Sequence, residues 1–145
     1  MDDQYDLERF VSAQSTTYDH ALAELRRGQK TSHWMWFIFP QVAGLGRSEI
    51  SRQYAICSLN EAQAYLAHPV LGPRLVECAT VLAHTQGKTA VEIMGQVDAQ
   101  KLRSCMTLFM RAAPRQEVFA RVLGHYFPAG ADPATDERLG EHGRL

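Results

Sequence analysis

Apolar residues recur along this chain at the spacing of one helical face, and the alternation typical of strands is almost absent. The fullest match follows Asp98, where apolar side chains fall at positions i, i+3, i+4, i+7 and i+8 before Pro114 ends the pattern. They are Leu102, Cys105, Met106, Phe109 and Met110. We expect Asp98 to cap this helix and the first four of these residues to form a central buried stripe.

Shorter segments repeat the same period and begin or end at residues typical of helix termini. Two of these segments begin at Asp6 and at Asp132, and the others cover residues 16–28, 58–68, 73–87, 89–95 and 118–128. Two of them open with the spacing of a capping box, at Ser58 and Thr89, and Thr16 with Asp19 forms a similar start. Gly28 can close its helix in the left-handed conformation. The sequence therefore predicts an all-α fold. We expect a single compact domain of seven or eight short helices at residues 6–139, a disordered or extended N-terminus at 1–5, and a loose C-terminal tail at 140–145.

The aromatic run at residues 34–39 is the one segment whose class the pattern leaves open. Ser32 can cap a helix there and Pro40 should end it. The aromatic content of so short a run is equally compatible with a buried strand, because periodicity cannot separate the two over six residues.

Composition and charge narrow the class of protein. The chain has 145 residues, of which 46% are apolar and 21% charged, so it can bury one sizeable core. Fifteen Lys and Arg residues nearly balance sixteen Asp and Glu residues, for a formal net charge of −1. We therefore expect neither nucleic acid nor an anionic membrane surface as a partner.

The N-terminus is acidic and no apolar run follows it, so the sequence predicts a cytoplasmic protein without a membrane span. Three cysteines, Cys57, Cys78 and Cys105, form no C-x-x-C pair. We expect them to be small buried side chains without an intramolecular disulfide. The alternative is that one of them is a nucleophile or a metal ligand.

Signatures of known cofactor and metal sites are missing. The chain has no P-loop, no G-x-G-x-x-G, no G-x-S-x-G and no H-E-x-x-H. Its six histidines show no metal-ligand spacing with each other or with the cysteines. We therefore expect no metal and no cofactor, and any site must be assembled from distant segments.

Three features can supply such a site. His33 and Trp36 lie three apart, and on a helix they would share a face able to stack a planar ligand. The alternative is that the aromatic run is simply core.

The second feature is a helical face that carries Lys101, Ser104 and Thr107 and is turned away from the apolar stripe. This face could bind a ligand or, through a Lys–Ser pair, activate a nucleophile. The alternative is a solvated polar face.

The third feature is a glycine-containing loop with the composition of an anion cradle. It contains Gln41, Gly44, Gly46, Arg47 and Ser48. The glycines allow a tight backbone with exposed N–H groups, Arg47 offers a fork of donors, and Ser48 can cap a following helix. A plain connection between two helices explains the same residues.

Several of these segments resemble one family. The resemblance lies at residues 7–10, 32–41, 44–48, 54–56, 68–75 and 101–109, and it extends over residues 6–128. Together they are similar to the uncharacterised bacterial family indexed as domain of unknown function 1810, whose members are sometimes labelled calpastatin. The resemblance implies a small helical fold and no known reaction. The family usually has a serine where this chain has Cys105, so no serine hydroxyl is required there.

The resemblance also implies a common site, because the family pattern includes polar residues of all three features. They are His33, Trp36, Gln41, Gly44, Gly46, Lys101, Ser104 and Thr107. We therefore expect a pocket for a small anionic or planar, nucleotide-like ligand, bordered by His33, Trp36, Arg47 and Lys101, with catalysis left open. The alternative is a non-catalytic protein–protein interaction module.

Overall fold

The computed structural model describes residues 3–142, which form ten helices. An isolated parallel bridge pairs Val42 with Ile56, on either side of one short helix. The helices are α1 (Glu8–Gln14), α2 (Tyr18–Arg27), α3 (Met35–Ile38), α4 (Glu49–Gln53), α5 (Leu59–Ala67), α6 (Leu71–His84), α7 (Ala90–Met94), α8 (Gln96–Ala112), α9 (Glu117–Tyr126) and α10 (Pro133–His142). The all-α prediction is confirmed, but seven or eight helices was too few. Helices such as α3 and α4 span about one turn, which is too short for a hydrophobic period to reveal.

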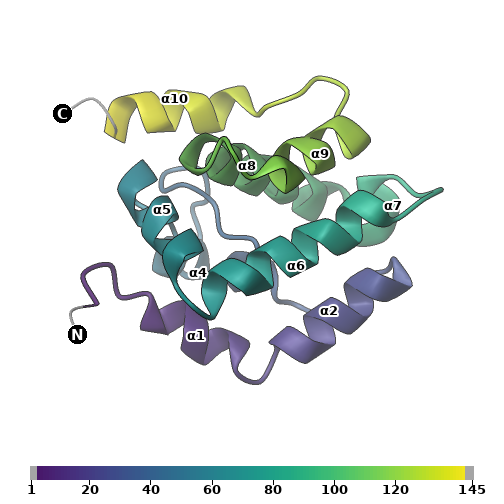
Figure 1. Cartoon of the computed structure of the whole chain (residues 1–145), viewed down its shortest axis with the longest axis horizontal. Helices are drawn as coiled ribbons and strands as arrows, with labels where there is room; N and C mark the ends of the chain where they lie inside the picture. The colour runs from purple at the N-terminus through teal and green to yellow at the C-terminus, as the bar shows by residue number, and fades with distance from the viewer. Residues whose placement is uncertain (1–2, 143–145) are drawn as a thin grey trace.

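Helices α6 and α8 lie at the centre of the fold (Figure 1). Helix α8 packs against α5, α7, α9 and α10, while α6 packs against α2, α5 and α9. In the view of Figure 1, α10 covers one side of this pair and α1 and α2 cover the opposite side. Within residues 3–142 no helix is both long enough and apolar enough to cross a membrane.

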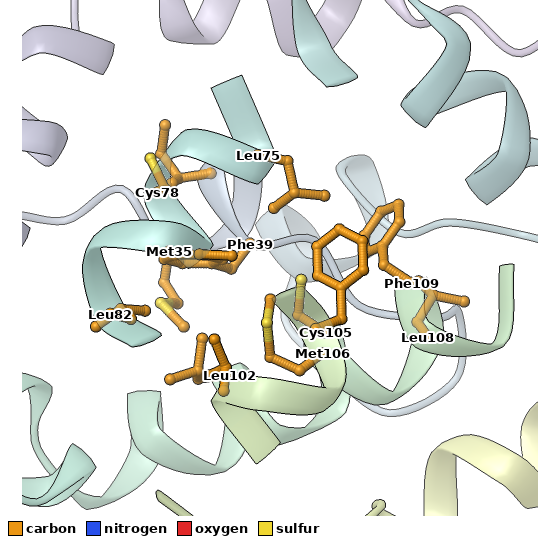
Figure 2. Close-up of a cluster of buried hydrophobic side chains, with 14 of the residues drawn as sticks. Met35, Phe39, Leu75, Cys78, Leu82, Leu102, Cys105, Met106, Leu108 and Phe109 are labelled. Atoms are coloured by element: carbon orange, nitrogen blue, oxygen red, sulfur yellow. The ribbon is translucent and has the colours of Figure 1, made fainter. Parts of the chain in front are cut away.

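The predicted apolar stripe of α8 is the centre of the core. Leu102, Cys105, Met106 and Phe109 are all 0% exposed, which confirms that prediction. Figure 2 shows them facing side chains of α6, with Met35 and Phe39 packed between the two helices. The Phe109 ring also lies 5.3 Å from the Tyr65 ring and 5.9 Å from the Phe119 ring, each distance measured between centroids.

Local signals at two helix ends were predicted correctly: Thr89 and Glu92 form a capping box, and Gly28 closes α2 with φ of 73°. The capping box predicted at Ser58 forms only in part. The Ser58 hydroxyl accepts a hydrogen bond from the Glu61 backbone N–H, but the Glu61 carboxylate accepts from the Cys57 N–H. These contacts satisfy backbone groups that a helix terminus otherwise leaves without partners.

Four caps were assigned to the wrong residue. The N-cap of α2 is Thr17 rather than Thr16, and that of α3 is Trp34 rather than Ser32. Helix α8 begins at Gln96 after Gly95, so Asp98 lies inside its first turn rather than at its cap. The carboxylate at the start of α1 is that of Asp3, which accepts hydrogen bonds from the backbone N–H groups of Leu7 and Glu8, and not that of Asp6. At the other end, α10 continues past Gly140 to His142. The remainder of the predicted tail, 143–145, lies outside the described residues, as do residues 1 and 2.

The three cysteines are free, as predicted. Cys78 and Cys105 are buried in the core, where burial raises the pKa of Cys78 to about 12 and the pKa of Cys105 well above the ordinary thiol value. Cys57 was expected to be buried and is exposed instead, because it follows the bridge residue Ile56 at the edge of a surface loop.

The connection between α2 and α3 is organised by one buried carboxylate. Glu24, 4% exposed, accepts hydrogen bonds from the backbone N–H groups of Thr31 and Ser32 at 2.7 and 3.0 Å, and from the Trp34 indole N–H at 3.0 Å. Burial raises the pKa of Glu24, but these donors outweigh burial and lower the pKa to about 2. Glu24 thereby sets where the aromatic run enters the core, and the run forms the short helix α3 rather than a strand.

Phe109→Ala should lower the free energy of unfolding by about 3–5 kcal/mol, because it leaves a cavity in the buried core. Urea unfolding followed by circular dichroism measures the change. The matched control is Val97→Ala on the same helix, where a 71% exposed side chain should change stability by less than about 0.5 kcal/mol. Equal losses in the two variants would contradict the assignment of the core.

Glu24→Gln should make the free energy of unfolding less dependent on pH in the acidic range. Because folding depresses the pKa of Glu24, its contribution is complete above the unfolded value near 4.5 and is lost as pH falls toward about 2. At pH 7 the variant should be less stable than the wild type by about 2–3 kcal/mol, and the gap should close between pH 4.5 and 2. Urea unfolding at a series of pH values tests this, and a gap that stays constant down to pH 2 would refute it.

Candidate functional site

Two neighbouring cavities lie where α3, α8 and the connection of residues 40–57 meet. Their volumes are about 120 and 480 Å³. The first is lined by Met35, Trp36, Phe39, Gln41, Val42, Ala43, Gly44, Gly46, Ser51, Arg52, Tyr54, Ala55, Cys57 and Lys101. The second is lined by Gln41, Leu45, Gly46, Gln96, Val97, Gln100, Lys101, Ser104, Asp132 and Ala134. Gln41, Gly46 and Lys101 belong to both, so the two cavities share a wall.

The connection of residues 40–57 is held rigidly at its ends. The Ala43 N–H donates to the Ile56 carbonyl and the Ile56 N–H to the Gln41 carbonyl, both at 2.8 Å. Arg9 reaches across from α1, donates to the Gln53 and Ala55 carbonyls, and pairs with the buried Glu61 carboxylate at 3.0 Å. These contacts fix the backbone that forms one side of the first cavity.

Both glycines of this connection are required because neighbouring side chains approach the backbone too closely for a Cβ atom. A Cβ atom at Gly44, whose φ is 97°, would lie 2.9 Å from Nε of Arg138, whose side chain crosses from α10. A Cβ atom at Gly46 would lie 2.5 Å from that of Ser51. The predicted glycine loop therefore exists, and its glycines let neighbouring side chains pack on the backbone beside the cavity.

Trp36 and Lys101 meet at the wall of the first cavity. Helix α3 buries Met35 and Ile38 in the core, which leaves Trp36 half-buried on the opposite side. The Lys101 ammonium lies 5.0 Å from the centroid of the Trp36 ring, within the range of a cation–π interaction. The aromatic run and the Lys101 helix are thus in contact.

The charge on Lys101 is only partly offset. Asp98, one turn earlier on α8, holds Lys30 at 2.8 Å through Oδ2, and its Oδ1 lies 3.8 Å from Nζ of Lys101. Lys30 also donates to the Ser32 carbonyl at 2.6 Å and lies over the Trp34 ring. Asp98 makes a cation tolerable near the start of α8. Its closer partner is nevertheless Lys30, so Lys101 keeps net positive charge beside the cavity.

Ser104 and Thr107 do not lie on a solvated face, which was the alternative interpretation of this side of the helix. They are 2% and 0% exposed. The Ser104 hydroxyl donates to Asp132 Oδ2 at 2.9 Å, and the Thr107 hydroxyl accepts from the Asp132 backbone N–H at 2.9 Å. The physical reason is that α10 packs on this side of α8, so these polar side chains contact the start of α10 rather than water.

The remaining predicted residues lie outside the two cavities. His33 and Arg47 are exposed. Ser48 caps α4, as predicted, by accepting a hydrogen bond from the Ser51 N–H at 3.2 Å. The arginine that lines the first cavity is Arg52, which sequence reasoning missed because it lies inside a helix too short to show a period.

The Cys57 thiol is the other side chain at this site that the sequence did not single out. It lies at the edge of the first cavity. Desolvation raises the pKa of Cys57, and the nearby Glu61 carboxylate raises it further against a smaller opposing effect of Arg9. The thiol is therefore protonated at neutral pH and is a poor nucleophile. Among the described residues, no group of three or more His, Cys, Asp or Glu side chains is arranged to hold a metal ion.

The chain was compared with known proteins. A crystal structure of the conserved hypothetical protein Rv1873 from Mycobacterium tuberculosis is similar at 48% identity, with a TM-score of 0.93, over 95% of this chain and 99% of that one. The comparison with curated proteins gives no match. The model of the family described as "Protein of unknown function (DUF1810)" matches residues 4–139. The chain therefore belongs to this family.

Proposed function

We propose that this protein binds a small molecule with a phosphate or carboxylate group, and that the first cavity holds this group together with part of a planar body. The observation that carries the proposal is the position of Lys101, which stacks on Trp36 and stands in the wall shared by both cavities. A cation beside an aromatic face is a combination that recognises planar anions.

The charges around the first cavity support an anion. Its lining includes two cations, Lys101 and Arg52, and, among the described residues, no carboxylate. Asp98, the nearest carboxylate to Lys101, is engaged by Lys30. An anionic group entering the cavity meets positive charge that is only partly offset, in a partly enclosed space where electrostatic attraction is stronger than in water.

The size of the cavities limits the ligand. About 120 Å³ admits one ring or one phosphate group, since a cavity of about 150 Å³ holds a single benzene. A nucleotide-sized ligand has to extend past Lys101 into the second cavity of about 480 Å³. The ligand we propose therefore has two parts that meet at Lys101.

Two residues predicted to border the pocket, His33 and Arg47, lie outside it and are not needed by this proposal.

We propose binding and assign no reaction. The Cys57 thiol is protonated, and the Ser104 hydroxyl is engaged by Asp132, so neither is an activated nucleophile. The alternative of a protein-interaction module has less support, because the large apolar side chains exposed within the described residues are Val91 and Val97 rather than a contiguous patch.

Cys57 offers a direct test, because it is exposed at the first cavity while Cys78 and Cys105 are buried. With the folded protein, a thiol reagent such as dithiobis(nitrobenzoate) should modify Cys57 alone, and with the unfolded protein it should modify all three cysteines. Phenyl phosphate, as a planar anion, should slow the modification of Cys57 in the folded protein several-fold. Mass spectrometry of labelled peptides measures the rate.

Lys101→Met should abolish this protection, because it removes the cation while keeping the length of the side chain. Lys88→Met is the matched control, since Lys88 lies away from both cavities and should leave protection intact. Without ligand, the melting temperature of Lys101→Met should stay within a few degrees of the wild type. Protection that is absent in the wild type, or that survives Lys101→Met, would refute the proposed function.

A further inference from the structure

The second cavity has a different chemistry from the first. Its wall includes three primary amides, those of Gln41, Gln96 and Gln100, together with the carboxylate of Asp132. Three of its other residues, Leu45, Val97 and Ala134, are apolar, and Val97 is 71% exposed. Such a wall is suited to a flat body whose edge carries both hydrogen-bond donors and acceptors.

The two oxygens of Asp132 are used very unequally. The side chain is 4% exposed, and Oδ2 accepts three hydrogen bonds, from Ser104 Oγ at 2.9 Å, Thr135 Oγ1 at 2.7 Å and the Thr135 N–H at 3.3 Å. Among the described residues, Oδ1 accepts one, from the amide of the exposed Gln100 at 3.4 Å. A buried carboxylate oxygen with one long hydrogen bond retains most of its capacity to accept.

The structural role of Asp132 does not account for this oxygen. Asp132 precedes α10 and caps it through Oδ2, a role that asparagine or serine fills equally well. Oδ1 takes no part in the cap. Because Asp132 lines the second cavity, a donor placed there would complete the coordination of Oδ1 by displacing the long contact with Gln100.

We infer that the second cavity is a subsite for an amino-substituted nitrogen heterocycle, with Asp132 Oδ1 accepting a hydrogen bond from the amino group. Glutamine amides pair with the donor and acceptor edge of amino-substituted rings, and carboxylates accept from their amino groups. Gln96 and Gln100 are one turn apart on α8 and line the same cavity as Lys101, so their amides can contact the ring nitrogens. The inference rests on the proposed function for the identity of the whole ligand: an aminated heterocycle in the second cavity, joined past Lys101 to an anionic group in the first.

The test uses the full chain and a pair of uncharged probes, 2-aminopyrimidine and 2-methylpyrimidine, which have the same shape and differ in the amino group. Dissociation constants come from titrations followed by ligand-observed NMR. The amino compound should bind the wild type about tenfold more tightly. Asp132→Asn should abolish this preference. Its amide oxygen has to face Ser104 and Thr135 to preserve the cap, which puts an NH₂ group where Oδ1 was.

Asp136→Asn, in the first turn of α10, is the matched control and should keep the tenfold preference. Melting temperatures of both variants verify that they fold. Equal binding of the two probes by the wild type, binding of neither, or a preference that survives Asp132→Asn each overturns the inference.

Phenyl phosphate, titrated in parallel, reports on the first cavity alone. If it fails to bind while the pyrimidine pair is discriminated, the proposed function is lost and the subsite stands. If it binds and the pair is not discriminated, the subsite is lost and the proposed function stands. Adenosine 5′-monophosphate and purine riboside 5′-monophosphate, which differ by one amino group, then test the two cavities together. The aminated nucleotide should bind about tenfold more tightly to the wild type and with no preference to Asp132→Asn.

Discussion

The arrangement of this protein depends on the burial of one short segment, residues 34–39, between α6 and α8. Trp34, Met35, Ile38 and Phe39 are each at most 2% exposed. A four-residue helix cannot be stable alone, so its geometry is imposed by this burial and by the hydrogen bond between Trp34 and Glu24. Because these four side chains are fixed in the core, the Trp36 side chain lies on the opposite side of the segment, where it contacts Lys101 of α8.

The charges beside the first cavity then determine what it can bind. The ion pair between Lys30 and Asp98 ties the turn after α2 to the first turn of α8, and it engages the carboxylate that would otherwise neutralise Lys101. Lys30 is itself 7% exposed and lies over Trp34, so the pair is packed rather than solvated. The positive charge at the cavity is therefore maintained by residues that do not touch the cavity.

Much of the fold could be predicted from the sequence, because the period of α8 and the caps at Thr89 and Ser58 are local signals. The contact between the aromatic run and Lys101 was also expected, although only from a resemblance to other sequences. What the pattern could not reveal was the second side of α8. Ser104 and Thr107 look like a solvated face until α10 packs on them, and that packing depends on a contact with Asp132, twenty-eight residues from Ser104 along the chain.

The same reasoning explains which site residues were missed. Arg52 and Cys57 lie in a segment whose shape comes from a single bridge between Val42 and Ile56 and from Arg9 of α1, and none of these has a signature in the sequence. Arg47 and His33 are residue types suited to binding a planar anion, and both lie close in sequence to residues that line the first cavity. They point outward because the neighbouring residues, Gly46 and Trp34, occupy the inner side of each turn.

The central claim, that a planar anion binds beside Lys101 and Trp36, is tested most directly by a ¹H–¹⁵N correlation spectrum. The chain has two tryptophans and therefore two indole N–H signals, one from the buried Trp34 and one from Trp36 at the cavity. Addition of phenyl phosphate should shift the Trp36 signal in a saturable manner and leave the Trp34 signal in place. A spectrum in which neither signal moves, or in which both move together, would contradict the account.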